Sequence, residues 1–249
     1  YMESIKPYKK GFHYSYTLGA FPTYELIQTH PEIVKAVYIH STFTDRQNLL
    51  DLCHTAQIPV LSDDKLFHKL SDKENCFVIG VFEKYECTLK QDKSHIVLVN
   101  PSNMGNLGTI VRTAVAMGIY DLALITPCAD LFHPKTIRAS MGSLFRLRHQ
   151  HFDSFREYRE KYPDHDVFTF MLNGENTLEI QNCPRTELFS LVFGNEATGL
   201  DDSFLAEGTS ICIPQSPDVD SLNITIAVGI GAFVFTHQPK INFQPEADK

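Results

Sequence analysis

Residues 96–126 read IVLVNPSNMGNLGTIVRTAVAMGIYDLALIT, and this stretch decides the fold class. Its two apolar runs, 96–100 and 122–126, have the length and composition of buried strands. Between them, apolar residues recur at helical spacing, which predicts a helix over 107–117. A strand, a helix and a second strand in succession are typical of a βα unit with parallel strands.

The same alternation continues to the end of the chain. It predicts helices at 135–141, 154–161 and 221–236, and strands at 144–148, 167–172, 190–194 and 210–214. We therefore expect an α/β fold with a mostly parallel sheet covered on both faces. Ligands of such sheets sit beyond the carboxyl ends of the strands, so the loops after residues 100, 172, 194 and 214 are the expected site.

A smaller α/β unit precedes this sheet. Its predicted helices are 24–28 and 46–56, and its predicted strands are 36–40, 58–61 and 76–82. The polar, charged stretch that follows is the best candidate for a linker. The expected organisation is a small domain at 1–88, a linker at 89–94, a second domain at 95–238 and a polar tail at 239–249.

Composition limits the partners that the chain can bind. The formal net charge is −8, so the molecule as a whole is no general polyanion binder and any nucleic-acid contact must be local. An acid-free window between Asp130 and Asp153 is either a solvated face or a phosphate-binding field. Its cations are Lys135, Arg138, Arg146 and Arg148.

The cysteines and the apolar stretches indicate a cytoplasmic protein. The six cysteines lie far apart, without the spacing of a zinc site, which favours free thiols and no metal. The longest apolar stretch, 222–235, is too short to span a membrane, and the polar start lacks the apolar core of a signal peptide.

Three short segments carry residue patterns that suit a binding site. Gly105 and Gly108 allow a tight strand-to-helix turn whose exposed amides favour an anion, although the pattern equally fits a structural turn with a solvated Arg112. Glu196, in FGNEATGL (193–200), either serves such a site or caps a local turn. Ser221 starts the last predicted helix, whose apolar surface indicates burial in a core or a subunit interface.

Taken together, four motifs in this order resemble the SpoU/TrmH group of SPOUT-superfamily RNA methyltransferases. They are NPSNMGNLGTIVRTA (100–114), RASMGSLFRL (138–147), FGNEATGL (193–200), and IP followed by SLNITIAVGIGAF (213–233). Residues 1–88 resemble, less specifically, the small RNA-binding domain that precedes the catalytic domain in many of these enzymes.

The resemblance implies a trefoil knot in the carboxyl-terminal domain, a homodimer formed through the last helix, and S-adenosylmethionine as the methyl donor. It implies methyl transfer to a ribose 2′-hydroxyl of rRNA or tRNA. The implied catalytic residues are Asn106, Arg112, Glu196, Ser221 and Asn223. The implied cofactor-binding residues are Leu172, Asn173, Gly194, Asn195, Gly199, Ile213, Gln215 and Leu222. The RNA-binding residues are expected to be the four cations of the acid-free window.

Two questions stay open at this level. A guanidinium has a pKa above about 12 and no lone pair, so Arg112 acts either as a transient base or by orienting the hydroxyl and binding the adjacent phosphate. Pro217 stands where the family usually has glycine, which keeps a non-catalytic RNA-binding relative as an alternative. A nucleotide-dependent oxidoreductase is disfavoured, because the chain lacks the GxGxxG fingerprint.

Overall fold

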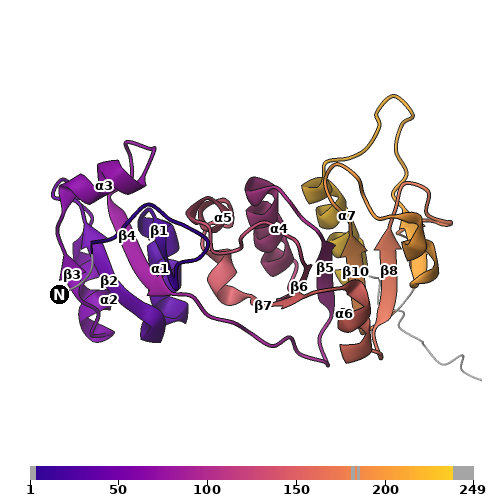
Figure 1. Ribbon diagram of the computed structural model, residues 1–249, viewed down its shortest axis with the longest axis horizontal. Helices are drawn as coiled ribbons and strands as arrows, with labels where there is room; N and C mark the ends of the chain where they lie inside the picture. Colours follow the sequence, from indigo (N-terminus) through magenta and orange to yellow (C-terminus); the bar gives the residue numbers. More distant parts are fainter. Residues whose placement is uncertain (1–3, 181–182, 184–185, 238–249) are drawn as a thin grey trace, which may run out of the picture.

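The computed structural model describes residues 4–180, 183 and 186–237, and the expected tail at 239–249 lies outside them. Two sheets form the molecule, and Figure 1 shows them at its two ends with α5 between them. The first sheet contains residues 14–83, and the second contains residues 95–212.

The first sheet has four strands in the order β1-β4-β2-β3. Its β1/β4 and β2/β4 pairs are antiparallel, and its β2/β3 pair is parallel. The strands are β1 Tyr14–Leu18, β2 Val34–Ile39, β3 Val60–Leu61 and β4 Val78–Glu83. The helices are α1 Ala20–Thr29, α2 Gln47–Thr55 and α3 Asp64–Leu70, with a 3-10 turn η1 Pro31–Ile33.

The second sheet has seven strands in the order β7-β6-β5-β10-β8-β11-β9, and every neighbouring pair is parallel. The strands are β5 His95–Val99, β6 Asp121–Ile125, β7 Arg148–Phe152, β8 Asp166–Phe170, β9 Asn176–Thr177, β10 Phe189–Phe193 and β11 Thr209–Cys212. The helices are α4 Met104–Ala116, α5 Pro134–Ala139, α6 Phe155–Lys161 and α7 Ile224–Thr236, with 3-10 turns η2 Ser143–Arg146 and η3 Asp202–Ala206.

The central strands are buried on both faces, which explains their nearly continuous apolar sequences. Ile96 and Leu98 of β5 belong to the core beneath α4 and α7. Val97, between them, belongs to the core beneath α6 and η3. The α/β architecture with a mostly parallel sheet is therefore confirmed. The threading of the carboxyl-terminal segment stays a prediction.

Two local predictions are wrong. Residues 144–148 do not form a strand, because 143–146 are the 3-10 turn η2 and the strand begins at Arg148. This strand, RHQHF, lies at the edge of the sheet, where one side has no partner strand, and its polar sequence gave no strand signal. The last helix is capped by Asn223 instead of Ser221, since the Asn223 side chain accepts from the Thr225 amide.

An extensive seam joins the two sheets. Phe82 of β4 packs edge-on against Phe145, with ring centroids 5.2 Å apart, and also contacts Phe132. The hydroxyl of Ser15 donates to the Phe132 carbonyl, and Arg146 forms an ion pair with Glu25 of α1. One continuous apolar core contains residues from both sheets.

The amino ends of the parallel strands form a closed, polar edge. Asp121 at the start of β6 has a fully buried side chain, which accepts two hydrogen bonds from the Arg148 guanidinium at 2.6 and 2.8 Å. At the start of β5, His95 bonds to the Tyr158 hydroxyl at 2.8 Å and to the Lys90 carbonyl at 2.7 Å. These contacts hold the segment between β4 and β5 against the amino edge of the sheet.

Candidate functional site

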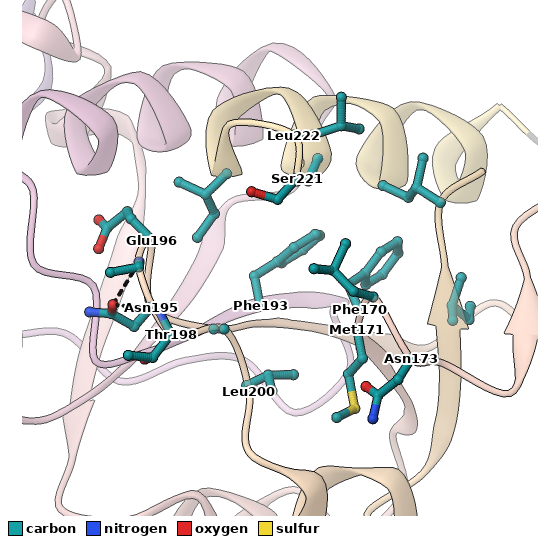
Figure 2. Close-up of a pocket in the computed structure, with 18 of the residues that line it drawn as sticks. Phe170, Met171, Asn173, Phe193, Asn195, Glu196, Thr198, Leu200, Ser221 and Leu222 are labelled. Atoms are coloured by element: carbon teal, nitrogen blue, oxygen red, sulfur yellow. Dashed lines mark hydrogen bonds between the residues drawn. The ribbon is translucent and has the colours of Figure 1, made fainter. Parts of the chain in front are cut away.

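A cavity of about 300 Å³ opens at the carboxyl edge of the second sheet. Its walls come from the ends of β8, β10 and β11, the loops that follow them, and the start of α7 (Figure 2). This volume is at the lower end of the range for small-molecule sites. All eight residues expected to bind a cofactor line it: Leu172, Asn173, Gly194, Asn195, Gly199, Ile213, Gln215 and Leu222.

The cavity has an apolar floor and polar ends. The rings of Phe170 and Phe193 stack with centroids 4.4 Å apart, and Figure 2 shows Ser221 and Leu222 above them. Sequence reasoning did not name these two aromatic residues. Both are the last residues of parallel strands, so the rule that ligands bind at strand carboxyl ends could have found them.

Gly194 lets the loop after β10 fold back on itself. A Cβ atom built at this position would lie 2.2 Å from the carbonyl carbon of Gly199, a distance that only glycine permits. Gly199 has φ +66°, in the left-handed region that favours glycine. The Asn195 side chain closes the loop by accepting from the Ala197 amide at 2.8 Å. The loop at 195–199 is thus a small fixed wall of the cavity.

Glu196 binds a loop that is distant in the sequence. Its carboxylate accepts from the backbone amides of Ser102 and Asn103, both at 3.0 Å, and from the Ser102 hydroxyl at 2.8 Å. Figure 2 shows this side chain pointing away from the Phe170 and Phe193 rings. Burial alone would raise the pKa of Glu196, but these hydrogen bonds outweigh burial and hold the pKa below its usual value. Glu196 therefore remains a carboxylate that ties the loop after β10 to the loop before α4.

Among the other residues expected to be catalytic, Ser221 lines the cavity and three lie outside its lining. Asn223 caps α7. Asn106 lies in the first turn of α4, and its backbone amide donates to Asn103 Oδ1. Arg112 lies on the exposed side of α4. In the part of the chain that the structure describes, the Arg112 side chain has no hydrogen bond or ion pair.

Pro217, the departure from the family pattern, also lies outside the cavity lining. It belongs to a turn in which the Val219 amide donates to the Ser216 carbonyl. Gln215, two residues earlier, does line the cavity, and its side-chain amide donates to the Asp220 carbonyl across the base of this loop. A proline is compatible with a turn at this position, since its φ is preset.

The four cations of the acid-free window divide into two pairs. Arg146 and Arg148 are engaged by Glu25 and Asp121, which come from other parts of the chain. Lys135 is exposed and Arg138 is half-buried, and neither forms an ion pair within the described residues. The sequence alone gave no sign that Arg146 and Arg148 are neutralised, because Glu25 and Asp121 lie outside the acid-free window.

The described residues hold no group of three or more histidine, cysteine or carboxylate side chains arranged for a metal ion. Within the same residues, no helix combines the length and the apolar character needed to cross a membrane.

Comparisons with solved structures show the same architecture. The chain superposes on the AdoMet-bound SpoU methyltransferase AviRb from Streptomyces viridochromogenes with a TM-score of 0.78, 20% identity, and coverage of 91% of this chain and 90% of that one. An AdoMet-bound rRNA methyltransferase from Sinorhizobium meliloti gives a TM-score of 0.75 at 24% identity, covering 89% and 86% of the two chains. At these identities, the likeness establishes the fold.

Two curated relatives match about half of the chain. The 23S rRNA (guanosine(2553)-2'-O)-methyltransferase RlmP of Bacillus subtilis is 33% identical over 131 residues, which cover 51% of each chain. A protein named as an uncharacterised tRNA/rRNA methyltransferase of Synechocystis sp. is 35% identical over 136 residues, covering 54% of this chain and 50% of its own. The chain thus spans about half the length of these relatives.

A sequence profile for the SpoU rRNA Methylase family matches residues 93–233, which is more than half of the chain. The matched range contains the cavity, the loop that Glu196 binds, and α7 up to Phe233. The chain therefore belongs to the SpoU rRNA methylase family.

Proposed function

We propose that this protein transfers a methyl group from S-adenosylmethionine to a ribose 2′-hydroxyl of rRNA or tRNA. The observation that carries the proposal is the convergence of three separate loops and the start of α7 on one cavity at the carboxyl edge of a parallel sheet. Family membership supports this reaction, as do the names of the relatives. A cytoplasmic location follows from the substrate, because ribosomal and transfer RNA are found there.

The cavity lining suits S-adenosylmethionine. The Phe170 and Phe193 rings, with Ile213, offer an apolar slot of the kind that an adenine ring needs. Asn173 and Gln215 also line the cavity and carry amide groups, which can serve as the hydrogen-bonding partners that ribose hydroxyls and a zwitterionic amino acid require. Gly194 and Gly199 also line the cavity and add no side chain to it.

When bound, S-adenosylmethionine supplies a sulfonium-linked methyl group, which the ribose oxygen accepts with loss of its proton and release of S-adenosylhomocysteine. The protein then has to align the nucleophile and neutralise the charges around it. Glu196 fixes the loop at 102–103 and, through that loop, the start of α4. Arg112, on α4, is assigned to the ribose: it orients the hydroxyl and binds the adjacent phosphate, or it acts as a transient base.

We further propose that two copies associate through α7. The exposed side of this helix carries Ile226 and Phe233, which are 53% and 48% exposed. Large apolar side chains at i and i+7 lie on the same face of a helix, so they form a stripe. Burial of this stripe against a second copy would remove it from water. The opposite side of α7 is already packed, with Val228 and Ala232 fully buried in the core.

Replacing Arg112 tests the reaction. The variant Arg112→Ala is expected to lose more than about 100-fold in methyl transfer to total cellular RNA, because it removes the only group assigned to the ribose. Labelled methyl donor and mapping of the modified ribose measure the effect. The matched control is Arg156→Ala, which removes an exposed arginine of α6 that is paired with Glu160.

Calorimetry on the same proteins separates the alternatives. S-adenosylmethionine is expected to bind the native chain and both variants equally, since Arg112 does not line the cavity. Full activity of Arg112→Ala would contradict its assigned role. Absence of cofactor binding by the native chain would favour a non-catalytic RNA-binding relative. Sedimentation velocity of these preparations should show dimers, and a monomer would contradict association through α7.

A further inference from the structure

A group of lysines near the amino end of the described chain lies outside every site considered so far. Residues 6–16, KPYKKGFHYSY, contain three lysines and no acidic residue, in a chain with 22 basic and 30 acidic residues. Lys6, Lys9 and Lys10 are all exposed. Lys84 joins them from the end of β4, and its ammonium donates to the Lys10 carbonyl at 2.8 Å.

Aromatic rings are interleaved with these lysines. The Lys84 ammonium lies 4.8 Å from the centroid of the Tyr8 ring, within cation–π range. Phe12 and Tyr14 stack with centroids 5.1 Å apart and an interplanar angle of 14°, and both rings are half-buried. We call Lys6, Tyr8, Lys9, Lys10, Phe12, Tyr14 and Lys84 the lysine–aromatic surface.

The carboxylate that meets this surface is used internally. Asp130 Oδ2 accepts from the Tyr8 hydroxyl, and its Oδ1 accepts from the Phe132 amide at 3.0 Å. Neither oxygen forms an ion pair with a lysine of the surface within the described ranges. Asp130 still acts on Lys84 through its charge, whereas Lys6, Lys9 and Lys10 form no ion pair within the described residues and remain available to an external anion.

The lysine–aromatic surface borders the carboxyl edge of the seven-stranded sheet. The Tyr8 ring packs against His133, with centroids 5.2 Å apart, and the ring of His133 accepts from the amide of Lys135. Tyr8 also donates to Asp130 in the loop after β6, and Lys84, whose ammonium lies over the Tyr8 ring, donates to the Lys10 carbonyl, so Lys10 lies near this loop.

That loop continues to the candidate site. The carbonyl of Pro127, one residue before Cys128, accepts from the side-chain amide of Asn100 at 3.1 Å. Asn100 directly follows β5 and stands two residues before Ser102, whose amide and hydroxyl bind Glu196. The lysine–aromatic surface therefore lies next to the loop after β6. This loop contacts the loop after β5, which in turn contacts the wall of the cavity. All of them lie along the carboxyl edge of the seven-stranded sheet.

We propose that the lysine–aromatic surface, together with Lys135, binds the phosphates and unpaired bases of the RNA that flank the methylated nucleotide. This inference rests on the proposed function and names where the substrate extends from the cavity. Lysines interleaved with aromatic rings match single-stranded RNA, whose phosphates need cations and whose splayed bases need stacking partners. Arg146 and Arg148 take no part, because Glu25 and Asp121 occupy them.

The double variant Lys9→Glu/Lys10→Glu tests the proposal on the full chain. Within the described part of the chain, these two side chains make no hydrogen bond or ion pair, and only their backbone carbonyls do. The fold should therefore tolerate the change. The matched control is Lys65→Glu/Lys161→Glu, on α3 and α6, which alters the net charge equally through two exposed lysines.

The measurement is the dissociation constant for a fluorescent 20-nucleotide oligouridine across a salt series. The test variant is expected to bind at least about tenfold more weakly, with a salt slope smaller by about 1.4, since each lost phosphate contact removes about 0.7. The control should match the native chain. Equal binding by test and control variants, or no oligouridine binding by the native chain, would overturn the proposal.

Two further readouts separate this surface from the proposed reaction. If the native chain methylates RNA and the test variant does so with an unchanged KM, the surface is refuted while the function stands. If the test variant loses oligouridine binding while the native chain methylates nothing, the surface stands without the function. Displacement of oligouridine by polyglutamate of equal charge would show a general anion surface and would refute RNA as its ligand.

Discussion

At the amino edge of the seven-stranded sheet, Asp121 binds Arg148 directly, whereas at the carboxyl edge Glu196 is held by the uncharged backbone amides of Ser102 and Asn103. The charges of Asp121 and Arg148 neutralise each other, so neither is available to a ligand. Glu196 keeps its negative charge while its position is fixed. The amino edge is thus neutralised internally, whereas the carboxyl edge keeps a fixed negative charge.

The largest change in stability is expected at the amino edge. Replacing Asp121 with alanine leaves the Arg148 guanidinium without its partner and also removes the acceptor of the Lys90 amide. Breaking such a buried pair costs about 3–5 kcal/mol, which urea unfolding would measure. The control Glu25→Ala breaks the more exposed pair with Arg146 and should cost at most about 1 kcal/mol. Similar losses in both variants would contradict the distinction.

At the carboxyl edge, the expected effect is on catalysis. The variant Glu196→Ala releases the loop at 102–103 and should lower methyl transfer by more than about 100-fold, because small displacements of a reacting group are costly. Its free energy of unfolding should fall by only about 1–2 kcal/mol, since water can replace the lost acceptor. Glu196→Gln keeps one acceptor oxygen and should retain more activity than Glu196→Ala. If Glu196→Ala lost much of its stability but kept normal activity, the proposed difference between the two edges would be wrong.

The smallest expected effect is a loss of stability at acidic pH. Burial lowers the pKa of His149, the second residue of β7, to about 4, below the value of about 6.5 for an unfolded chain. The unfolded state therefore binds the proton first, and stability falls as the pH drops from 6.5 towards 4. The contribution amounts to about 2 kcal/mol between pH 6.5 and pH 5.

Unfolding titrations at several pH values would measure this loss. His149→Gln can still donate a hydrogen bond to the Tyr85 carbonyl, as the imidazole does, but it does not titrate in this range. Its stability should depend less on pH than that of the native chain. An unchanged pH dependence would show that other groups control acid sensitivity.

Elements with strong apolar patterns could be predicted from the sequence. The strands at 96–100, 122–126 and 190–194 match β5, β6 and β10 within one residue, because strands buried on both faces have continuous apolar sequences. The pattern gave no indication of β1 or α3, and it misplaced β7, whose polar sequence reflects its position at the sheet edge.

For the candidate site, the motif resemblance supplied the lining residues and physical reasoning supplied the edge of the sheet. A local cap was a fair expectation for Glu196, because carboxylates near turns usually bind nearby amides. Its actual partner, Ser102, is 94 residues away in sequence, and spacing along the chain cannot indicate a contact that folding creates. The same limit hid the partners of Arg146 and Arg148.

The shared apolar seam has a consequence for how this protein can be divided. Phe132 and Phe145 belong to the second half of the chain, yet their rings pack against Phe82 of the first half. Separating the two halves at the connecting segment would expose the rings on both sides of the seam to water. Each half should therefore unfold at a lower temperature when produced alone than it does within the intact chain.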